Sequence, residues 1–339
     1  MKEIVRIKKW QLLRYRSRLE MVDLSAAEFL TVGKRAFHGQ RRLEEILLPA
    51  TASAIKTEAF RGCQRLKRVT FPRETNVGLA SGAFRGCWRL QDLQSFETVT
   101  TVGDRTFLGC RMLKKVELGA DLRRVGEESF RFCSSLEEIR LSQGLQEIGK
   151  RAFADCTELA RVHMEIGAET LAPEMFRACI SLREIELSAT LKELPRGVFR
   201  DCSALECITV PSSVLRIGAM AFCGCSRLRE VEIEQGTTHV GAFAFAKGAR
   251  LERIVIPHTL KRLGFGAFGL GIKKGERIEL VVDTEYMLRR MKLLLFLCGS
   301  AGRVRVTMEG KTLEERARER RRSTLEQIPT HLIDPKEKD

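Results

Sequence analysis

The sequence predicts a protein of the α/β class, a solenoid in which about eleven short coils stack in a line. One observation is the aromatic composition, because 18 phenylalanines stand against 2 tryptophans and 2 tyrosines. This bias indicates one structural position that phenylalanine fills repeatedly. The other observation is regular spacing, with intervals of 23 residues and a single interval of 24. The recurring residues are Phe37, Phe60, Phe84, Phe107, Phe130, Phe153, Phe176, Phe199, Phe222, Phe245 and Phe268.

We number each repeat from its phenylalanine, which is position 0. Positions +9 and +11 are mostly apolar, whereas positions +8 and +10 are mostly polar. This period of two predicts a short strand with one buried face. Ser95 interrupts the apolar row at +11. Proline follows the strand in several repeats and would end the pairing of its backbone, as at Pro49, Pro72, Pro211 and Pro257.

The segment around the phenylalanine is expected to turn. Cysteine occupies +3 in eight repeats and leucine occupies +6 in ten. The spacing of three predicts a short helical or 3₁₀ turn whose phenylalanine, cysteine and leucine point inward. An apolar residue at −5, often followed by glycine, predicts a second short extended segment. A single repeat buries too little to offset the entropy of ordering its chain, so the repeats must stack on one another.

The pattern Ile-Gly-x-x-Ala-Phe-x-x-Cys-x-x-Leu-x-x-Ile-x-Ile-Pro resembles the BspA-like leucine-rich repeat, which has 23-residue repeats and is common in bacterial and some protist proteins. Residues 217–228 are a close copy of it, and the resemblance covers about residues 25–282. It implies a curved, right-handed leucine-rich-repeat solenoid that works by binding. Many members of this family are extracellular and adhesive.

Atypical flanks are expected because the terminal coils must cover an apolar face. We interpret residues 1–24 as an N-terminal cap, residues 283–328 as a small C-terminal helix–strand–helix cap, and residues 329–339 as a flexible tail. Asp283 or Thr284 is a candidate N-cap for the first helix, which would end near Gly299.

Two further patterns fill the predicted C-terminal cap. Val304, Val306 and Met308 alternate with polar residues and predict a strand. A capping box at Thr312-x-x-Glu315 predicts the start of a second helix, which carries the basic run Arg316–Arg322.

The 11 cysteines are expected to be free. The N-terminal segment is basic but has no apolar core of the length that a secretory signal needs, which favours a reducing, cytoplasmic location. Because free cysteine packs as a small hydrophobe, the row at +3 is interpreted as core rather than as a metal or disulfide ladder. No apolar stretch is long enough to predict a membrane span.

No catalytic constellation is present in the sequence. The five histidines, His38, His163, His239, His258 and His331, do not cluster at metal-ligand spacing. No phosphate-binding loop, nucleophile elbow or zinc-protease motif occurs. We therefore expect no enzyme activity, cofactor or metal.

Charge is the remaining functional signal. Lys and Arg total 59 against 44 Asp and Glu, which gives a net charge of +15 and a pI near 9.6. Arginine recurs at +1, and stacking would line these residues along a basic edge: Arg61, Arg85, Arg131, Arg177 and Arg200. Positions +8 and +10 would form a mixed polar face of the kind that reads protein surfaces, including Lys115, Glu138, Arg140, Arg161, His163, Glu184 and Glu186.

Two functions are compatible with these patterns. The first is a non-enzymatic scaffold that binds a protein partner, such as an acidic one, through the outward strand face and the arginine edge. The second is nucleic-acid binding through the same edge and the Arg316–Arg322 helix. The second is weaker, because the sequence shows no recognised nucleic-acid module and stacking aromatics are nearly absent. The sequence leaves the partner and the oligomeric state open.

Overall fold

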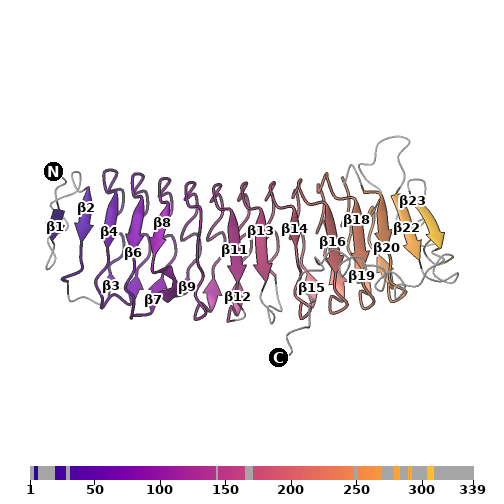
Figure 1. Ribbon diagram of the computed structural model, residues 1–339, viewed down its shortest axis with the longest axis horizontal. Helices are drawn as coiled ribbons and strands as arrows, with labels where there is room; N and C mark the ends of the chain where they lie inside the picture. Colours follow the sequence, from indigo (N-terminus) through magenta and orange to yellow (C-terminus); the bar gives the residue numbers. More distant parts are fainter. Residues whose placement is uncertain are drawn as a thin grey trace, which may run out of the picture.

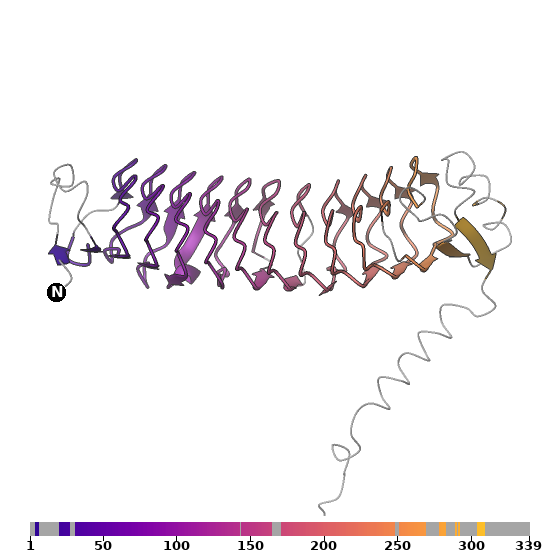
Figure 2. The same ribbon diagram turned by 90° about the horizontal axis from the view of Figure 1, so that it is seen from above.

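In the computed structural model, the chain is an elongated and gently bent solenoid of parallel strands (Figure 1 and Figure 2). The structure describes residues 4–6, 20–27, 31–142, 144–164, 171–247, 251–268, 278–282, 289, 291 and 304–308. Most coils contribute one strand to each of two sides of the solenoid. The solenoid and its short strands are as predicted from the 23-residue period.

The strands at +8 to +11 form one side, which we call the strand face. Its strands pair in parallel within three groups, which are separated at the coil of Phe107 and before Cys207, and each paired residue lies opposite its equivalent in the next coil, as Ile139 does with Val162. In chain order they are β1 (Ile4–Arg6), β2 (Met21–Asp23), β4 (Glu45–Leu47), β6 (Arg68–Thr70), β8 (Asp92–Gln94), β11 (Glu138–Leu141), β13 (Arg161–Met164), β14 (Glu184–Ile185), β16 (Cys207–Val210), β18 (Glu230–Ile233), β20 (Arg253–Val255), β22 (Ile278–Val282) and β23 (Val304–Met308).

The apolar and glycine positions near −5 form a second, shorter set of parallel strands. Their pairing follows the same one-coil register, as between Val125 and Ile148. The strands are β3 (Thr31–Val32), β5 (Ala54–Ile55), β7 (Val77–Leu79), β9 (Val99–Val102), β10 (Arg124–Val125), β12 (Glu147–Ile148), β15 (Glu193–Leu194), β17 (Arg216–Ile217), β19 (His239–Val240) and β21 (Arg262–Leu263). Two extended sides joined by turns give each coil a flat cross-section.

The eleven phenylalanines are buried and form one continuous stack. Ring centroids of neighbouring coils lie between 4.9 and 5.9 Å apart, and the planes differ by at most 19°. Each ring therefore packs its faces against the rings of its two neighbours, an offset-stacked arrangement that aromatic pairs favour. The inward position predicted for the phenylalanine is confirmed.

The predicted helical or 3₁₀ turns are wrong, because the segment around each phenylalanine is a pair of tight turns. Residues at −2 and +2 adopt positive φ, as at Glu128 (52°) and Phe132 (60°). Such left-handed residues interrupt a right-handed helix. Alternate amides also point away from the turn: the Phe130 N–H donates to Ala152 O at 2.8 Å in the next coil, while the Arg131 N–H donates to Glu128 O at 3.2 Å.

The eight cysteines at +3 are buried, as predicted, and each has a hydrogen-bond acceptor. Each thiol donates to the backbone oxygen of the phenylalanine one coil earlier, at 3.1 to 3.4 Å. Burial raises the pKa of seven of these thiols, and that of Cys202 reaches about 12. Because all eight thiols are buried in the core, they are out of reach of reagents in solution.

Ser95, which breaks the apolar row, marks a local rearrangement. It adopts a left-handed conformation with φ of 57°, and the short 3₁₀ helix η2 (Phe96–Thr98) follows. The turn directs Phe96 into the core, where its ring lies 5.5 Å from Phe71 and 5.7 Å from Phe107. Phe96 thus fills the space in the core that an apolar side chain at Ser95 would otherwise occupy.

The ends of the chain are described in part. Strands β1 and β2 pair with one another and then with β4, so they continue the strand face toward the N-terminus. At the other end, the segment predicted as a strand is β23, paired with β22. Arg289 and Met291 are helical, but the rest of the predicted C-terminal helices and the predicted tail lie outside the described residues. Among the described residues, no helix has the length and apolarity to cross a membrane.

Candidate interaction surface

The strand face presents a network of paired charges in its central coils. The Glu138 carboxylate lies 3.2 Å from both Arg140 Nε and Arg161 Nε, and 3.3 Å from His163 Nε2. Partial burial of Glu138 opposes its charge, but hydrogen bonds from the two arginines and the nearby His163 outweigh it, so the pKa of Glu138 is lowered. Lys115 pairs with Glu117 at 2.5 Å. The side chains at these positions project outward, as the alternation predicts.

Two predicted members of this face lie in the next coil. Glu184 is a residue of β14, and its side chain is outside the described part of the structure. Glu186 follows β14 and is exposed. The strand face is therefore continuous through this coil.

The arginines at +1 do line one edge, but the edge is not a basic strip. Arg131 lies 2.7 Å from Glu128 and 2.8 Å from Asp155. Arg61 pairs with Glu58, and Arg177 and Arg200 lie 4.0 and 3.3 Å from Asp201, while Arg85 has no ion pair with a described residue. The predicted row of free positive charge is thus largely neutralised.

Carboxylates at −2 make this neutralisation regular. This position alternates between Arg and Glu over several coils, and neighbours pair along the edge: Arg35 with Glu58 at 2.7 Å, Arg105 with Glu128 at 2.9 Å, and Arg151 with Glu174 at 2.5 Å. In Glu128, hydrogen bonds from Arg105 and Arg131 outweigh the effect of burial, and they lower its pKa. The edge is a ladder of alternating charge that joins successive coils.

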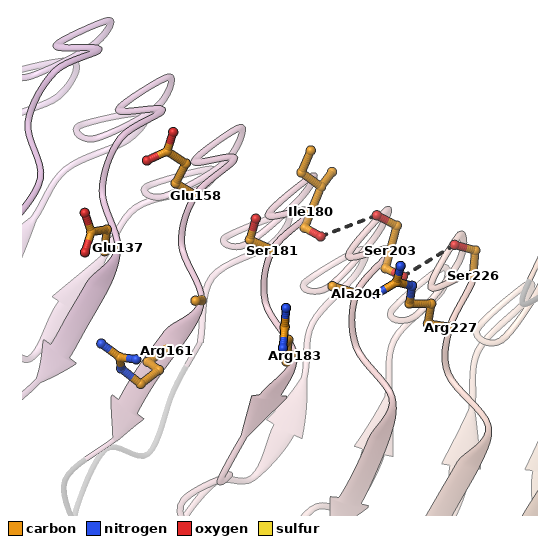
Figure 3. Close-up of a pocket in the computed structure, with 11 residues that line it drawn as sticks. Glu137, Glu158, Arg161, Ile180, Ser181, Arg183, Ser203, Ala204, Ser226 and Arg227 are labelled. Atoms are coloured by element: carbon orange, nitrogen blue, oxygen red, sulfur yellow. Dashed lines mark hydrogen bonds between the residues drawn. The ribbon is translucent and has the colours of Figure 1, made fainter.

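A groove of about 820 Å³ lies beside the strand face, over the turns at +4 and +5 (Figure 3). Its lining comes from five successive coils. The lining residues are Glu137, Glu158, Ala160, Arg161, Ile180, Ser181, Arg183, Ser203, Ala204, Ser226 and Arg227. Arg161 belongs to the strand face as well, so the two surfaces are continuous.

The groove exists because small side chains occupy the turn. Ser203 Oγ donates to Ile180 O at 3.5 Å, and Ser226 Oγ donates to Ser203 O at 3.4 Å (Figure 3). These hydroxyls lie close to the backbone of the preceding coil instead of projecting outward. Ile180 takes the serine position in its own coil, and its side chain is 48% exposed. The groove therefore offers an apolar contact among hydroxyl, carboxylate and guanidinium groups.

The groove has no arrangement suited to catalysis or metal binding. Within the described ranges, no group of three or more His, Cys, Asp or Glu side chains could hold a metal ion. The hydroxyls of Ser203 and Ser226 donate to backbone carbonyls, and the lining contains no histidine that could act as a base. Its exposed groups can make apolar contacts, ion pairs and hydrogen bonds.

Sequence reasoning found the strand face but missed the groove. The repeat pattern does not single out Ile180 or Ser203, because their position, +4, holds several residue types. The available signal was a change in side-chain size at +4 and +5, from Arg, Trp and Met in early repeats to Ser, Thr and Ala in central ones. The second predicted element of nucleic-acid binding, Arg316–Arg322, lies outside the described residues.

Comparison with known proteins agrees with this geometry. The family described as the BspA type leucine rich repeat region matches residues 30–160 and 146–271, in six copies. The chain belongs to this family. A leucine-rich repeat protein from Bacteroides ovatus has a similar structure, with 19% identity, a TM-score of 0.57, and coverage of 88% of this chain and 85% of its own. BspA-type repeats thus account for the parallel-strand solenoid.

Other solved structures are more distant. The pneumococcal vaccine antigen PcpA is 16% identical, with a TM-score of 0.48 and coverage of 86% of this chain and 80% of its own. Comparison with the curated proteins gives no match. Leucine-rich repeat scaffolds are typical protein-interaction modules and are generally not enzymes.

Proposed function

We propose that this BspA-type chain is a non-enzymatic scaffold that binds a protein partner through the strand face and the adjoining groove. The observation that carries the proposal is the groove itself, which spans five coils and exposes Ile180 between charged side chains. Protein interfaces combine such an apolar centre with a polar rim. The charge network around Glu138 supplies the rim on the strand side.

The extent of the surface supports a macromolecular partner. The lining comes from separate coils, so a ligand that contacts Glu137 at one end and Arg227 at the other must itself be extended. A chain running along the solenoid could meet backbone, hydroxyl and charged groups in every coil. A small molecule would use a fraction of these contacts.

Site-specific photo-cross-linking in native lysate tests the proposal. A photoreactive phenylalanine analogue replaces Ile180 or Arg183 in the groove, and a matched protein carries it at Lys192, an exposed residue outside the groove lining. We expect one defined protein adduct from the groove positions, and its loss when Ser203→Arg fills the groove. Adducts of equal yield at Lys192, or adducts indifferent to Ser203→Arg, would contradict this function.

We also infer that the protein works in a reducing compartment. The ten cysteines in the described part of the chain are all free, and Cys207 is exposed. An exposed thiol is readily oxidised outside such a compartment. Trapping thiols with an alkylating reagent during lysis should find Cys207 reduced, and a mixed disulfide at Cys207 would count against this location.

A further inference from the structure

The early coils carry a second surface at positions +4 to +7, next to the groove. It is strongly basic, since seven cations accompany one carboxylate: Arg41, Arg42, Glu44, Arg65, Lys67, Arg89, Arg111 and Lys114. Lys67 pairs with Glu44 at 2.9 Å. The five arginines form no ion pair with any residue that the structure describes, in contrast to those of the charge ladder at the edge. Their positive charge is available to another molecule.

Two large apolar side chains are exposed among these arginines. Trp88 is 47% exposed and Met112 is 41% exposed. The Arg111 guanidinium lies 5.8 Å from the centre of the Trp88 ring, and the Met112 N–H donates to Trp88 O at 3.2 Å. These contacts hold the two coils together and present one composite surface. We call Arg65, Trp88, Arg89, Arg111 and Met112 the tryptophan patch.

We propose that the tryptophan patch binds an acidic peptide segment of the protein partner, whose bulky apolar side chain packs on Trp88 and Met112. This inference rests on the proposed scaffold function. Arginine binds carboxylates through paired, charge-assisted hydrogen bonds. Tryptophan and arginine are also the residues that most often dominate the energy of protein interfaces. The patch supplies both types, and its charge is complementary to an acidic segment.

The dimensions of the patch fit a short segment. Neighbouring phenylalanine rings lie 4.9 to 5.4 Å apart in these coils, so the four coils that hold the arginines span about 15 Å. An extended chain rises roughly 3.3 Å per residue, so about five residues would cover this length. Beyond the patch the charge changes sign, because Glu137 and Glu158 occupy the equivalent positions of the next two coils.

This change of sign favours a peptide over longer anions. A nucleic-acid strand or an anionic bilayer that continued along the array would meet Glu137 and Glu158. Binding of single strands also uses a series of stacking aromatic rings. Among the described residues at +4 and +5, Trp88 is the one aromatic side chain. One ring with a neighbouring methionine is suited to a single apolar anchor.

Fluorescence of Trp88 gives a direct test in the full-length chain. The protein has 2 tryptophans, so Trp10→Phe leaves Trp88 as the sole tryptophan. The probe is a synthetic peptide in which acidic residues flank one phenylalanine. We expect binding to shift Trp88 emission to shorter wavelength, to weaken with added salt, and to be lost when glycine replaces the phenylalanine of the peptide.

A pair of charge reversals identifies the patch. Arg89→Glu with Arg111→Glu should weaken binding of the peptide by about tenfold or more. The matched control, Arg216→Glu with Arg262→Glu, changes the same net charge on exposed residues of β17 and β21 and should stay within about twofold of the parent. If the reversal impairs folding as judged by circular dichroism, Trp88→Ala with a fluorescently labelled peptide replaces it.

Three results would overturn the inference: an unchanged Trp88 emission, an equal loss of affinity in the control, or tighter binding of an oligonucleotide or a phosphatidylserine vesicle at physiological salt. The groove cross-linking uses different residues, so the two proposals fail separately. If the peptide does not bind, but the groove adducts still form in the Arg89→Glu and Arg111→Glu double variant, the patch is rejected and the scaffold function stands. Peptide binding without groove adducts rejects the groove as the binding surface.

Discussion

At the scale of single residues, position 0 needs a side chain that packs identically above and below. A flat ring meets this requirement, and the centroid of the Phe153 ring lies 5.2 Å from that of Phe130 and 5.9 Å from that of Phe176. Phe153→Ala should therefore open a void between two coils and reduce the free energy of unfolding by about 3–5 kcal/mol. Chemical denaturation measures it, with exposed Lys192→Ala as the control, expected to change stability by less than about 0.5 kcal/mol. Equal effects would mean that the rings do not form the core.

The thiols at +3 give a second prediction at this scale. Burial raises the pKa of Cys202 to about 12, so almost no thiolate forms there at pH 8. In the native protein, a thiol reagent should modify exposed Cys207 rapidly and leave the eight cysteines at +3 unmodified. All 11 cysteines should react in guanidinium. Cys207→Ser removes the fast phase, and rapid native labelling of seven or more thiols would contradict a buried row.

At the scale of elements, the structure departs from the sequence prediction in the turns. A spacing of three predicted the inward face correctly, because Phe130, Cys133 and Leu136 are all buried. It could not distinguish a helical turn from two tight turns, since both place every third residue inward. The deciding interaction is between coils, where the Phe130 N–H donates to Ala152 O. Local periodicity does not contain that information.

The charge ladder along the edge is the element with a pH dependence. Because the folded-state pKa of Glu128 is lowered, its charge stabilises the fold above the unfolded-state value, and this contribution is lost as the pH falls through the folded-state value. At neutral pH, Glu128→Gln should cost about 1–2 kcal/mol, since hydrogen bonds from Arg105 and Arg131 lose their charged acceptor. The difference in the free energy of unfolding between the variant and the parent should shrink below about pH 4.

Urea denaturation at neutral and acidic pH measures the effect of Glu128→Gln. Exposed Glu127→Gln, one residue away, is the matched control and should change stability little at either pH. A cost for Glu128→Gln that is independent of pH would show that the ladder contributes through packing alone.

At the scale of the whole molecule, the repeat period predicted the stacked architecture, but the binding surfaces depend on what varies between repeats. Phe107 and Phe130 mark the period, whereas Trp88, Ile180 and Ser203 lie at position +4, which no single residue type dominates. Which residues of adjacent coils lie beside these three follows only from the register between coils. The groove and the tryptophan patch thus form because the fold brings together residues at positions that vary from repeat to repeat.

The same register predicts the outcome of removing a coil. Deleting residues 108–130, one full period, joins Phe107 to Arg131 and leaves the next phenylalanine at position 0, Phe153, 23 residues further on. Because each coil contacts its neighbours alone, the shortened chain should keep a parallel solenoid that unfolds cooperatively with reduced stability. Deleting residues 108–118 instead removes half a period and should prevent stacking, since inward and outward positions no longer align. Circular dichroism and thermal denaturation compare the two deletions, and equal folding of both would contradict a core built by register between coils.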